Sequence, residues 1–271
     1  LCVVSPLGGR YASGVRMNIC DIHKNINIEV CEFLKNVPSV KEESITDYLV
    51  WQWNKANLQT KHFDVATFTR DWESRVTGSD FELDIWFMTK SGGSVLSVQA
   101  KKLTKQKDGY ARALRYKNNK KNQMDTLKNH ANLNNKNACY AFYTVPDSSS
   151  KCKISSLDIS EFGVFIANLT DIEPLTDKQI VKKKSVSVQV NQTVTKDMIL
   201  AKTYPLHALF CASSPSVKSS LLKKKALVPD LVMSLLNDSE ITTQDLNNYS
   251  ESDTKCLPRH VVVVGFEDKD A

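Results

Sequence analysis

Apolar and polar positions alternate most regularly between residues 81 and 100, where the pattern predicts an antiparallel β-hairpin. From Phe81 to Phe87 apolar side chains take every second position, and acidic residues stand among the positions between them. The Ser-Gly-Gly-Ser sequence at 91–94 is typical of a tight turn, and Val95–Ala100 returns with similar alternation. Because successive strand residues point to opposite faces, this hairpin should have one apolar face and one polar face.

Helical spacing of apolar residues predicts a helix before the hairpin. A serine cap with an acidic residue three positions later opens this helix, which should run over residues 44–53. Ile45, Leu49 and Trp53 form its inward stripe, and we also assign Trp51 to the core.

The rest of the pattern predicts one α/β domain with a mixed central sheet flanked by helices. Residues 1–16 are expected to be a disordered or upstream extension, because Met17 is a more natural start. Residues 17–271 then form a single domain, with a core over 43–145 and C-terminal additions over 151–271. Residues 204–211 should enter the core, and 238–253 are polar. Further strands are expected over residues 63–72, 138–145, 163–167 and 260–266, and helices over 109–129 (interrupted near 118–119), 176–183 and 229–237.

Cysteine usage and hydropathy indicate a compartment. The seven cysteines include no Cys-x-x-Cys pair and keep no zinc-ligand spacing with the five histidines. We therefore expect mostly buried free thiols in a reducing cytoplasm. The longest uninterrupted apolar run, Ala138–Tyr143, is far shorter than the roughly 20 residues that cross a bilayer, so no membrane span is expected.

Positive charge is concentrated in one segment. The chain has a formal net charge of +6, yet eleven Lys or Arg and two Asp between residues 101 and 136 give this segment alone +9. The remainder of the chain is therefore slightly acidic. A solvated lysine face is the ordinary interpretation of such a run, but its position directly after the polar hairpin favours a polyanionic partner.

The polar face of the hairpin carries the candidate chemistry. Asp80, Glu82 and Asp84 share this face of the first strand, and Gln99 and Lys101 share it on the second. Carboxylate oxygens bind Mg²⁺, which polarises a phosphate and lowers the pKa of an attacking water. A neighbouring lysine can orient that water and offset the developing charge. The arrangement suits metal-assisted phosphodiester hydrolysis, whereas the histidines offer no nucleophile–base pair.

Two stretches of the chain, Thr77–Glu82 and Val98–Lys102, resemble the PD-(D/E)XK restriction-endonuclease-like superfamily. The Gln-x-Lys form is similar to a branch that includes modification-dependent bacterial restriction enzymes and phage-defence effectors. The resemblance covers about residues 43–145 and implies a helix, a mixed sheet and a flanking helix. It also implies Mg²⁺, with Mn²⁺ as a substitute, and DNA hydrolysis in bacterial defence. A family of uncharacterised bacterial proteins with this core has the same order of Glu43–Leu49, Glu73, Tyr110, Gln123 and Tyr140–Tyr143.

The resemblance implies a role for each hairpin residue. Asp80 would be the main metal ligand, with Glu82 and Asp84 as competitors for that role. Gln99 replaces the usual acidic ligand and offers only a neutral carbonyl oxygen. Lys101 would orient the attacking water.

Residues outside the hairpin have two interpretations each. Glu43 is either a further ligand from the first helix or a carboxylate that favours the helix dipole, and Glu73 is either a carboxylate near the site or a turn residue. Tyr110 and Tyr116 could stack on bases or simply pack. The basic segment supplies the expected phosphate contacts, which we assign to Lys102, Lys105, Arg112, Arg115, Lys117, Lys120 and Lys121.

These patterns leave alternatives. Alternating carboxylates can be the solvated face of a half-exposed hairpin. A nuclease fold that has lost productive metal binding would be a nucleic-acid-binding or scaffolding protein, and Gln99 keeps this second hypothesis open. The expected partner is DNA, with RNA as an alternative, and a homodimer is left open.

Overall fold

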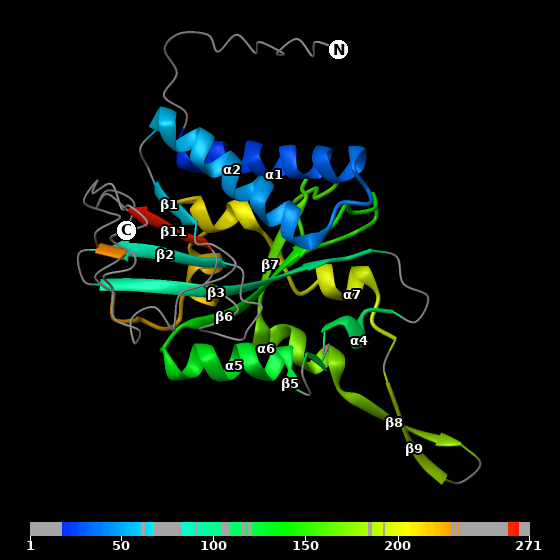
Figure 1. Ribbon diagram of the computed structural model, residues 1–271. Helices are drawn as coiled ribbons and strands as arrows, with labels where there is room; N and C mark the ends of the chain where they lie inside the picture. The colour runs from blue at the N-terminus through cyan, green and yellow to red at the C-terminus, as the bar shows by residue number, and fades with distance from the viewer. Residues whose placement is uncertain are drawn as a thin grey trace.

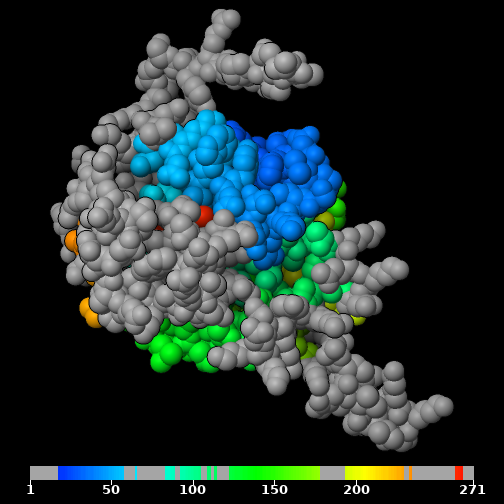
Figure 2. Space-filling model, viewed as in Figure 1, coloured from blue at the N-terminus to red at the C-terminus, as the bar shows by residue number. Residues whose placement is uncertain are grey.

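The chain folds into three layers (Figure 1). The computed structural model describes residues 18–60, 63–67, 83–89, 92–104, 109–114, 117–118, 121–183, 186–191, 193–228, 232–233 and 260–265. The predicted α/β class with a mixed sheet between helices is confirmed. Helices α1 (Ile19–Asn36) and α2 (Glu42–Thr60) cover one face of the sheet, and α5 (Gln123–Leu133) and α6 (Leu169–Ile172) cover the other. Figure 2 shows α1 and α2 as one blue surface and part of α5 as a green surface on the opposite side.

Within the described ranges, seven strands form the central sheet, in the order β1-β11-β2-β3-β6-β7-β10. The pairs β11–β2 and β3–β6 are parallel, and the other neighbours are antiparallel. The C-terminal strand β11 thus lies inside the sheet, between two strands from the first third of the sequence. The strands are β1 (Phe63–Thr67), β2 (Leu83–Thr89), β3 (Gly92–Lys102), β6 (Asn137–Tyr143), β7 (Val164–Asn168), β10 (Tyr204–Pro205) and β11 (His260–Gly265).

The predicted hairpin is confirmed as β2 and β3, with Leu83 opposite Val98 and Thr89 opposite Gly92. Its apolar face packs against α1, α2 and two shorter helices, η2 (Leu206–Phe210) and α8 (Pro215–Leu221). The predicted entry of residues 204–211 into the core is therefore also confirmed.

The helix predicted over 44–53 is confirmed and is longer at both ends. Trp53 is fully buried together with Ile45 and Leu49. Trp51 was assigned to the core, and this is wrong, because its side chain is 53% exposed. Residues two positions apart in a helix are separated by about 200° around its axis, so Trp51 and Trp53 cannot share one face.

Helix α1 is absent from the predictions above. Asn18 caps it by accepting a hydrogen bond from the Asp21 amide at 2.9 Å. Inside the helix, the Asn27 side chain accepts from the Gly163 and Val164 amides at 3.0 and 2.7 Å. A Cβ on Gly163 would lie 2.4 Å from the Cys31 nitrogen, so glycine permits the close approach of this segment to α1.

Two helix predictions are corrected. The segment 109–129 is not one helix but α4 (Ala111–Leu114), a two-stranded ribbon of β4 (Lys117–Asn118) and β5 (Lys121–Asn122), and α5. Its interruption near 118–119 is confirmed, and Asn122 restarts the helix by capping the Met124 amide. Residues 176–183 mostly form β8 (Lys178–Lys183), which pairs with β9 (Val186–Asn191). The β-branched Ile180 and Val181 in β8 and the three valines in β9 favour strands.

The predicted strands 138–145, 163–167 and 260–266 are confirmed as β6, β7 and β11, and 63–72 is confirmed as far as Thr67. Of the predicted helix 229–237 the structure describes only residues 232–233, and the polar stretch 238–253 lies outside the described residues.

The cysteine prediction is partly wrong. Cys20 at the start of α1 and Cys211 after η2 form a disulfide. Cys31, Cys139 and Cys152 are free and buried as expected, while Cys2 and Cys256 lie outside the described residues. In the part of the chain that the structure describes, no helix is long and apolar enough to cross a membrane.

Candidate active site

A row of polar side chains crosses the face of the β2–β3 hairpin that lies toward α5. Asp84 on β2 is directly opposite Ser97 on β3, so the two side chains share a face. Gln99 and Lys101 continue this row along β3 at intervals of about 6.7 Å. Asp84, Ser97 and Gln99 are no more than 2% exposed. The polar face is therefore real, but at these positions it is buried rather than solvated.

Asp84 forms a buried ion pair. Its Oδ2 lies 2.5 Å from the Nζ of Lys136, and the two side chains are 2% and 7% exposed. The turn after α5 positions this lysine, because the Lys136 amide donates to the Ala131 carbonyl at 2.7 Å and Asn135 adopts a left-handed φ of 51°. Burial, helped by the Lys136 charge, lowers the pKa of the nearby His130. The pair thus connects the start of β6 to β2 across the intervening strand β3, and it neutralises the charge of Asp84.

Three buried oxygens in this row have no hydrogen-bond partner among the residues that the structure describes. They are Oδ1 of Asp84, Oγ of Ser97 and Oε1 of Gln99. An unsatisfied buried polar group costs about 1–3 kcal/mol, so such atoms call for a ligand or bound water. Oxygen is the ligand type that Mg²⁺ prefers, and the Gln99 carbonyl oxygen fits that preference. A single neutral oxygen is too weak to hold the ion, which would need a carboxylate beside it.

Lys101 lies at the carboxyl end of β3 beside a glutamate from α2. Its Nζ is 3.5 Å from Oε1 of Glu42, and Oε2 of Glu42 accepts a 2.7 Å hydrogen bond from the Lys102 amide. Glu42 is the first residue of α2, where the helix dipole favours a carboxylate. The prediction named Glu43 as the carboxylate from this helix, whereas the structure places Glu42 at Lys101. Glu43, one position further around the helix, is exposed.

The other predicted residues are placed only in part. Lys102 is half-buried and donates to the Pro38 and Val40 carbonyls at 2.6 and 2.8 Å, so it fastens the turn after α1. The backbones of Arg112, Lys117 and Lys121 are described, but their side chains are not. Asp80, Glu82, Glu73, Lys105, Arg115 and Lys120 lie outside the described residues.

No cluster of three or more His, Cys, Asp or Glu side chains that could hold a metal occurs among the described residues. The main predicted ligand Asp80 and its competitor Glu82 are not among them. The candidate site is therefore described on its β3 side and at Asp84, and Asp80 and Glu82 remain predictions.

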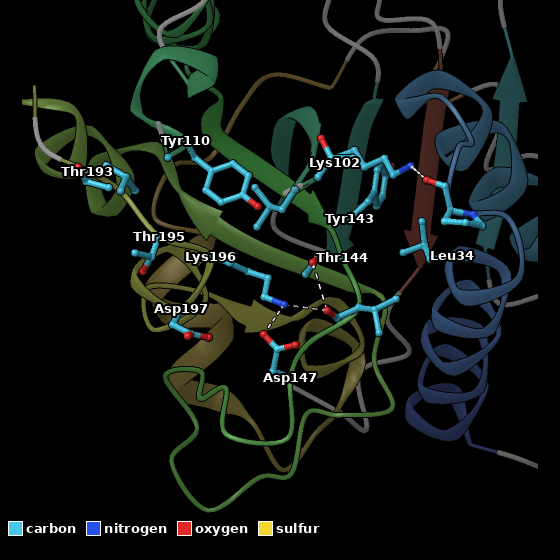
Figure 3. A pocket seen from close by; sticks show the side chains of 16 residues that line it. Leu34, Lys102, Tyr110, Tyr143, Thr144, Asp147, Thr193, Thr195, Lys196 and Asp197 are labelled. Atoms are coloured by element: carbon cyan, nitrogen blue, oxygen red, sulfur yellow. Dashed lines mark hydrogen bonds and ion pairs between the residues drawn. The ribbon is translucent and has the colours of Figure 1, made fainter. Parts of the chain in front are cut away.

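A cavity of about 710 Å³ opens where the parallel strands β3 and β6 end (Figure 3). Clefts beyond the carboxyl ends of parallel strands are the usual binding places in α/β sheets. Lys102 from β3 and Thr144 after β6 line one side of the cavity. Tyr110 and the segment 193–197, which begins helix α7 (Lys196–Leu200), line the other. Lys101 immediately precedes Lys102 along β3, so the polar row ends one residue before the cavity wall.

Charged groups in the cavity are paired. Lys196 contacts Oδ2 of Asp147 at 2.6 Å and donates to the Val145 carbonyl at 3.2 Å. Asp197 accepts a 2.7 Å hydrogen bond from Ser150. Burial raises the pKa of Tyr110, and the Asp147 carboxylate adds to this effect, so the phenol stays protonated and able to donate at neutral pH. The sequence prediction singled out Tyr110 but not the segment 193–197, whose proximity only the fold creates.

The sheet, its helical layers and its polar hairpin define an α/β protein with a candidate site at the carboxyl ends of β3 and β6. Residues 19–267 match the family described as a family of unknown function, DUF6615, and the chain belongs to this family. Neither a comparison with curated proteins nor one with solved structures gave a match.

Proposed function

We propose that this protein is a metal-dependent nuclease that hydrolyses phosphodiester bonds of DNA. The observation that carries the proposal is the buried carbonyl oxygen of Gln99, which has no hydrogen-bond partner in the described part of the chain and lies two residues before Lys101 on β3. A buried acceptor without a donor is stabilised when a cation binds it. The adjacent cavity provides room for substrate.

Each residue has a defined task in this proposal. Gln99 and the carboxylate of Asp80, or of Glu82 in its place, would hold Mg²⁺, which supplies polarisation of the phosphate and activation of water. Lys101 would hold the attacking water and offset charge in the transition state. Glu42 keeps the Lys101 ammonium near the end of β3 through their 3.5 Å contact. Asp84 is assigned a structural role, because Lys136 already neutralises it.

The distribution of charge supports a nucleic-acid substrate. The +9 segment from residue 101 to 136 begins with the last two residues of β3 and includes the ribbon of β4 and β5. The ribbon of β8 and β9 projects from the body of the protein in Figure 1, and the sequence from Lys178 to Asn191 contains four lysines and no acidic residue. A role in anti-phage defence stays a prediction of the superfamily resemblance.

Binding should depend steeply on salt, because each contact to phosphate releases counterions. Replacing Lys117, Lys120 and Lys121 together with glutamine should flatten the plot of log K against log salt by about 0.9 for each lysine that contacts a phosphate. Titration of fluorescent duplex DNA at several salt concentrations, in chelator, measures this slope.

The matched control replaces three exposed lysines of the α1–α2 layer, Lys24, Lys35 and Lys55, and should leave the slope unchanged. If the wild type and the variant of Lys117, Lys120 and Lys121 have equal salt slopes, these lysines belong only to a solvated face.

The experiment that tests the function is incubation of the protein with plasmid DNA in Mg²⁺ and in chelator. The nuclease proposal expects cleavage in Mg²⁺ alone. The alternative, a nuclease fold that only binds nucleic acid, expects binding without cleavage under both conditions.

A further inference from the structure

Tyr110 is built into the wall of the cavity at the ends of β3 and β6. It is 7% exposed, and its hydroxyl has no hydrogen-bond partner among the described residues. Its amide donates to the Val194 carbonyl at 2.9 Å. Gly109 makes this contact possible, because it has a φ of +74° and a Cβ there would lie 2.7 Å from the Val194 oxygen. The backbone thus fixes the ring so that it points into the cavity (Figure 3).

Lys196 and Asp147 offer further hydrogen-bonding groups to the same space (Figure 3). The Lys196 ammonium has three donors, of which two are used by Asp147 and the Val145 carbonyl. Asp147 uses Oδ2 in this pair, and no contact occupies its Oδ1 among the described residues. Together with the Tyr110 hydroxyl, these groups supply two donors and one acceptor, and the cavity is also lined by four threonines.

The cavity has no excess charge to select an anion. Lys102 and Lys196 balance Asp147 and Asp197 among its lining residues. The Lys102 ammonium is held by two main-chain carbonyls, so it is not aimed at a ligand. The groups left over suit a neutral molecule with hydrogen-bond donors and acceptors along one edge. Among the components of a nucleic acid, this describes the base and not the phosphate.

We propose that this cavity receives one unpaired nucleobase of the nucleic acid that the protein binds. The inference rests on the proposed function, because Lys101 ends the catalytic row one residue before Lys102 in the cavity wall. A base held here would fix the backbone next to Lys101. It would also require the substrate strand to be unpaired at that position.

Binding measured in chelator tests this without any cleavage. The probes are a single-stranded oligonucleotide and a chain of the same length and charge with abasic residues throughout. The wild type should bind the oligonucleotide at least about 10-fold more tightly, because a pair of hydrogen bonds to one base edge contributes about this much. Tyr110→Phe, which removes only the hydroxyl, and Lys196→Met should each reduce this ratio several-fold. Tyr48→Phe is the matched control, since the Tyr48 hydroxyl bonds Gln52 on α2, and the ratio should not change.

Two outcomes would overturn the inference. The first is equal affinity of the wild type for the two chains. The second is a ratio that both cavity variants leave intact. Free nucleoside monophosphates form a third arm: if they bind as tightly as the oligonucleotide and the abasic chain does too, the cavity is a small-molecule site and the inference is wrong. If the wild type prefers the oligonucleotide to the abasic chain but does not cleave DNA in Mg²⁺, the nuclease proposal is wrong and the base site is retained.

Discussion

Lys101→Ala is expected to lower the rate of DNA cleavage by at least about 100-fold, because it removes the group that stabilises charge in the transition state. Affinity for DNA in chelator should stay near that of the wild type. The free energy of unfolding should fall by no more than about 1 kcal/mol, since the 3.5 Å contact with Glu42 is partly exposed. Single-turnover cleavage of a labelled duplex, with denaturant unfolding alongside, measures both quantities.

Lys35→Ala is the matched control, because Lys35 is an exposed lysine in another ion pair, at the end of α1. It should cleave like the wild type. Gln99→Glu tests the metal site separately, since it supplies the acidic ligand that is usual in the superfamily that the hairpin resembles. A carboxylate at this buried position is costly without a cation, so Mg²⁺ should raise the melting temperature of Gln99→Glu more than that of the wild type. Full activity of Lys101→Ala would remove this lysine from the mechanism.

Lys136→Met is expected to lower the free energy of unfolding by about 3–5 kcal/mol, the usual cost of leaving a buried charge without its partner. The cause is Asp84, which is 1% exposed and whose Oδ2 loses its 2.5 Å contact with the lysine. Replacing both residues with apolar side chains, as Asp84→Leu with Lys136→Met, should recover most of the loss, because no charge then stays buried. Urea unfolding of the wild type, both single variants and the double variant gives the coupling energy of the pair.

The control for this series is Lys128→Met on the same helix layer. Lys128 pairs with Glu173 at 2.8 Å, but its side chain is 43% exposed, so the cost should be about 1 kcal/mol or less. A loss below about 0.5 kcal/mol in Lys136→Met would contradict the structural role of Asp84. Strong recovery of Lys136→Met by Mg²⁺ would instead make Asp84 a metal ligand.

Local patterns were sufficient for most of the elements. The β2–β3 hairpin was predictable because its turn chemistry and two-residue period agree, and α2 because its cap and apolar stripe agree. Trp51 was placed in the core by residue type alone, although helical geometry puts it away from Trp53. Helix α1 carried a usable signal, with Ile22, Ile26, Val30 and Leu34 at four-residue spacing behind the Asn18 cap.

Long-range pairing could not be predicted from the sequence. Nothing local shows that β11 inserts between β1 and β2, that Lys136 neutralises Asp84, or that Cys20 meets Cys211, since each pair forms only when distant segments come together. The same limit applies to the candidate site. Gln99 and Lys101 were predicted from their shared face of the hairpin and from the superfamily resemblance. Glu42 was missed in favour of its neighbour, because the helix start fixes the first turn and not which carboxylate turns toward β3.

The most direct test of the central claim is a cleavage assay that compares the wild type with Asp80→Asn. Modified and unmodified supercoiled plasmid, single-stranded DNA and RNA are each incubated with Mg²⁺, with Mn²⁺ and with chelator. The account predicts that the wild type cuts DNA only when a metal ion is present, and that Asp80→Asn binds DNA but does not cut it. Wild-type protein that binds DNA yet leaves modified, unmodified and single-stranded substrates intact in both metals would contradict it.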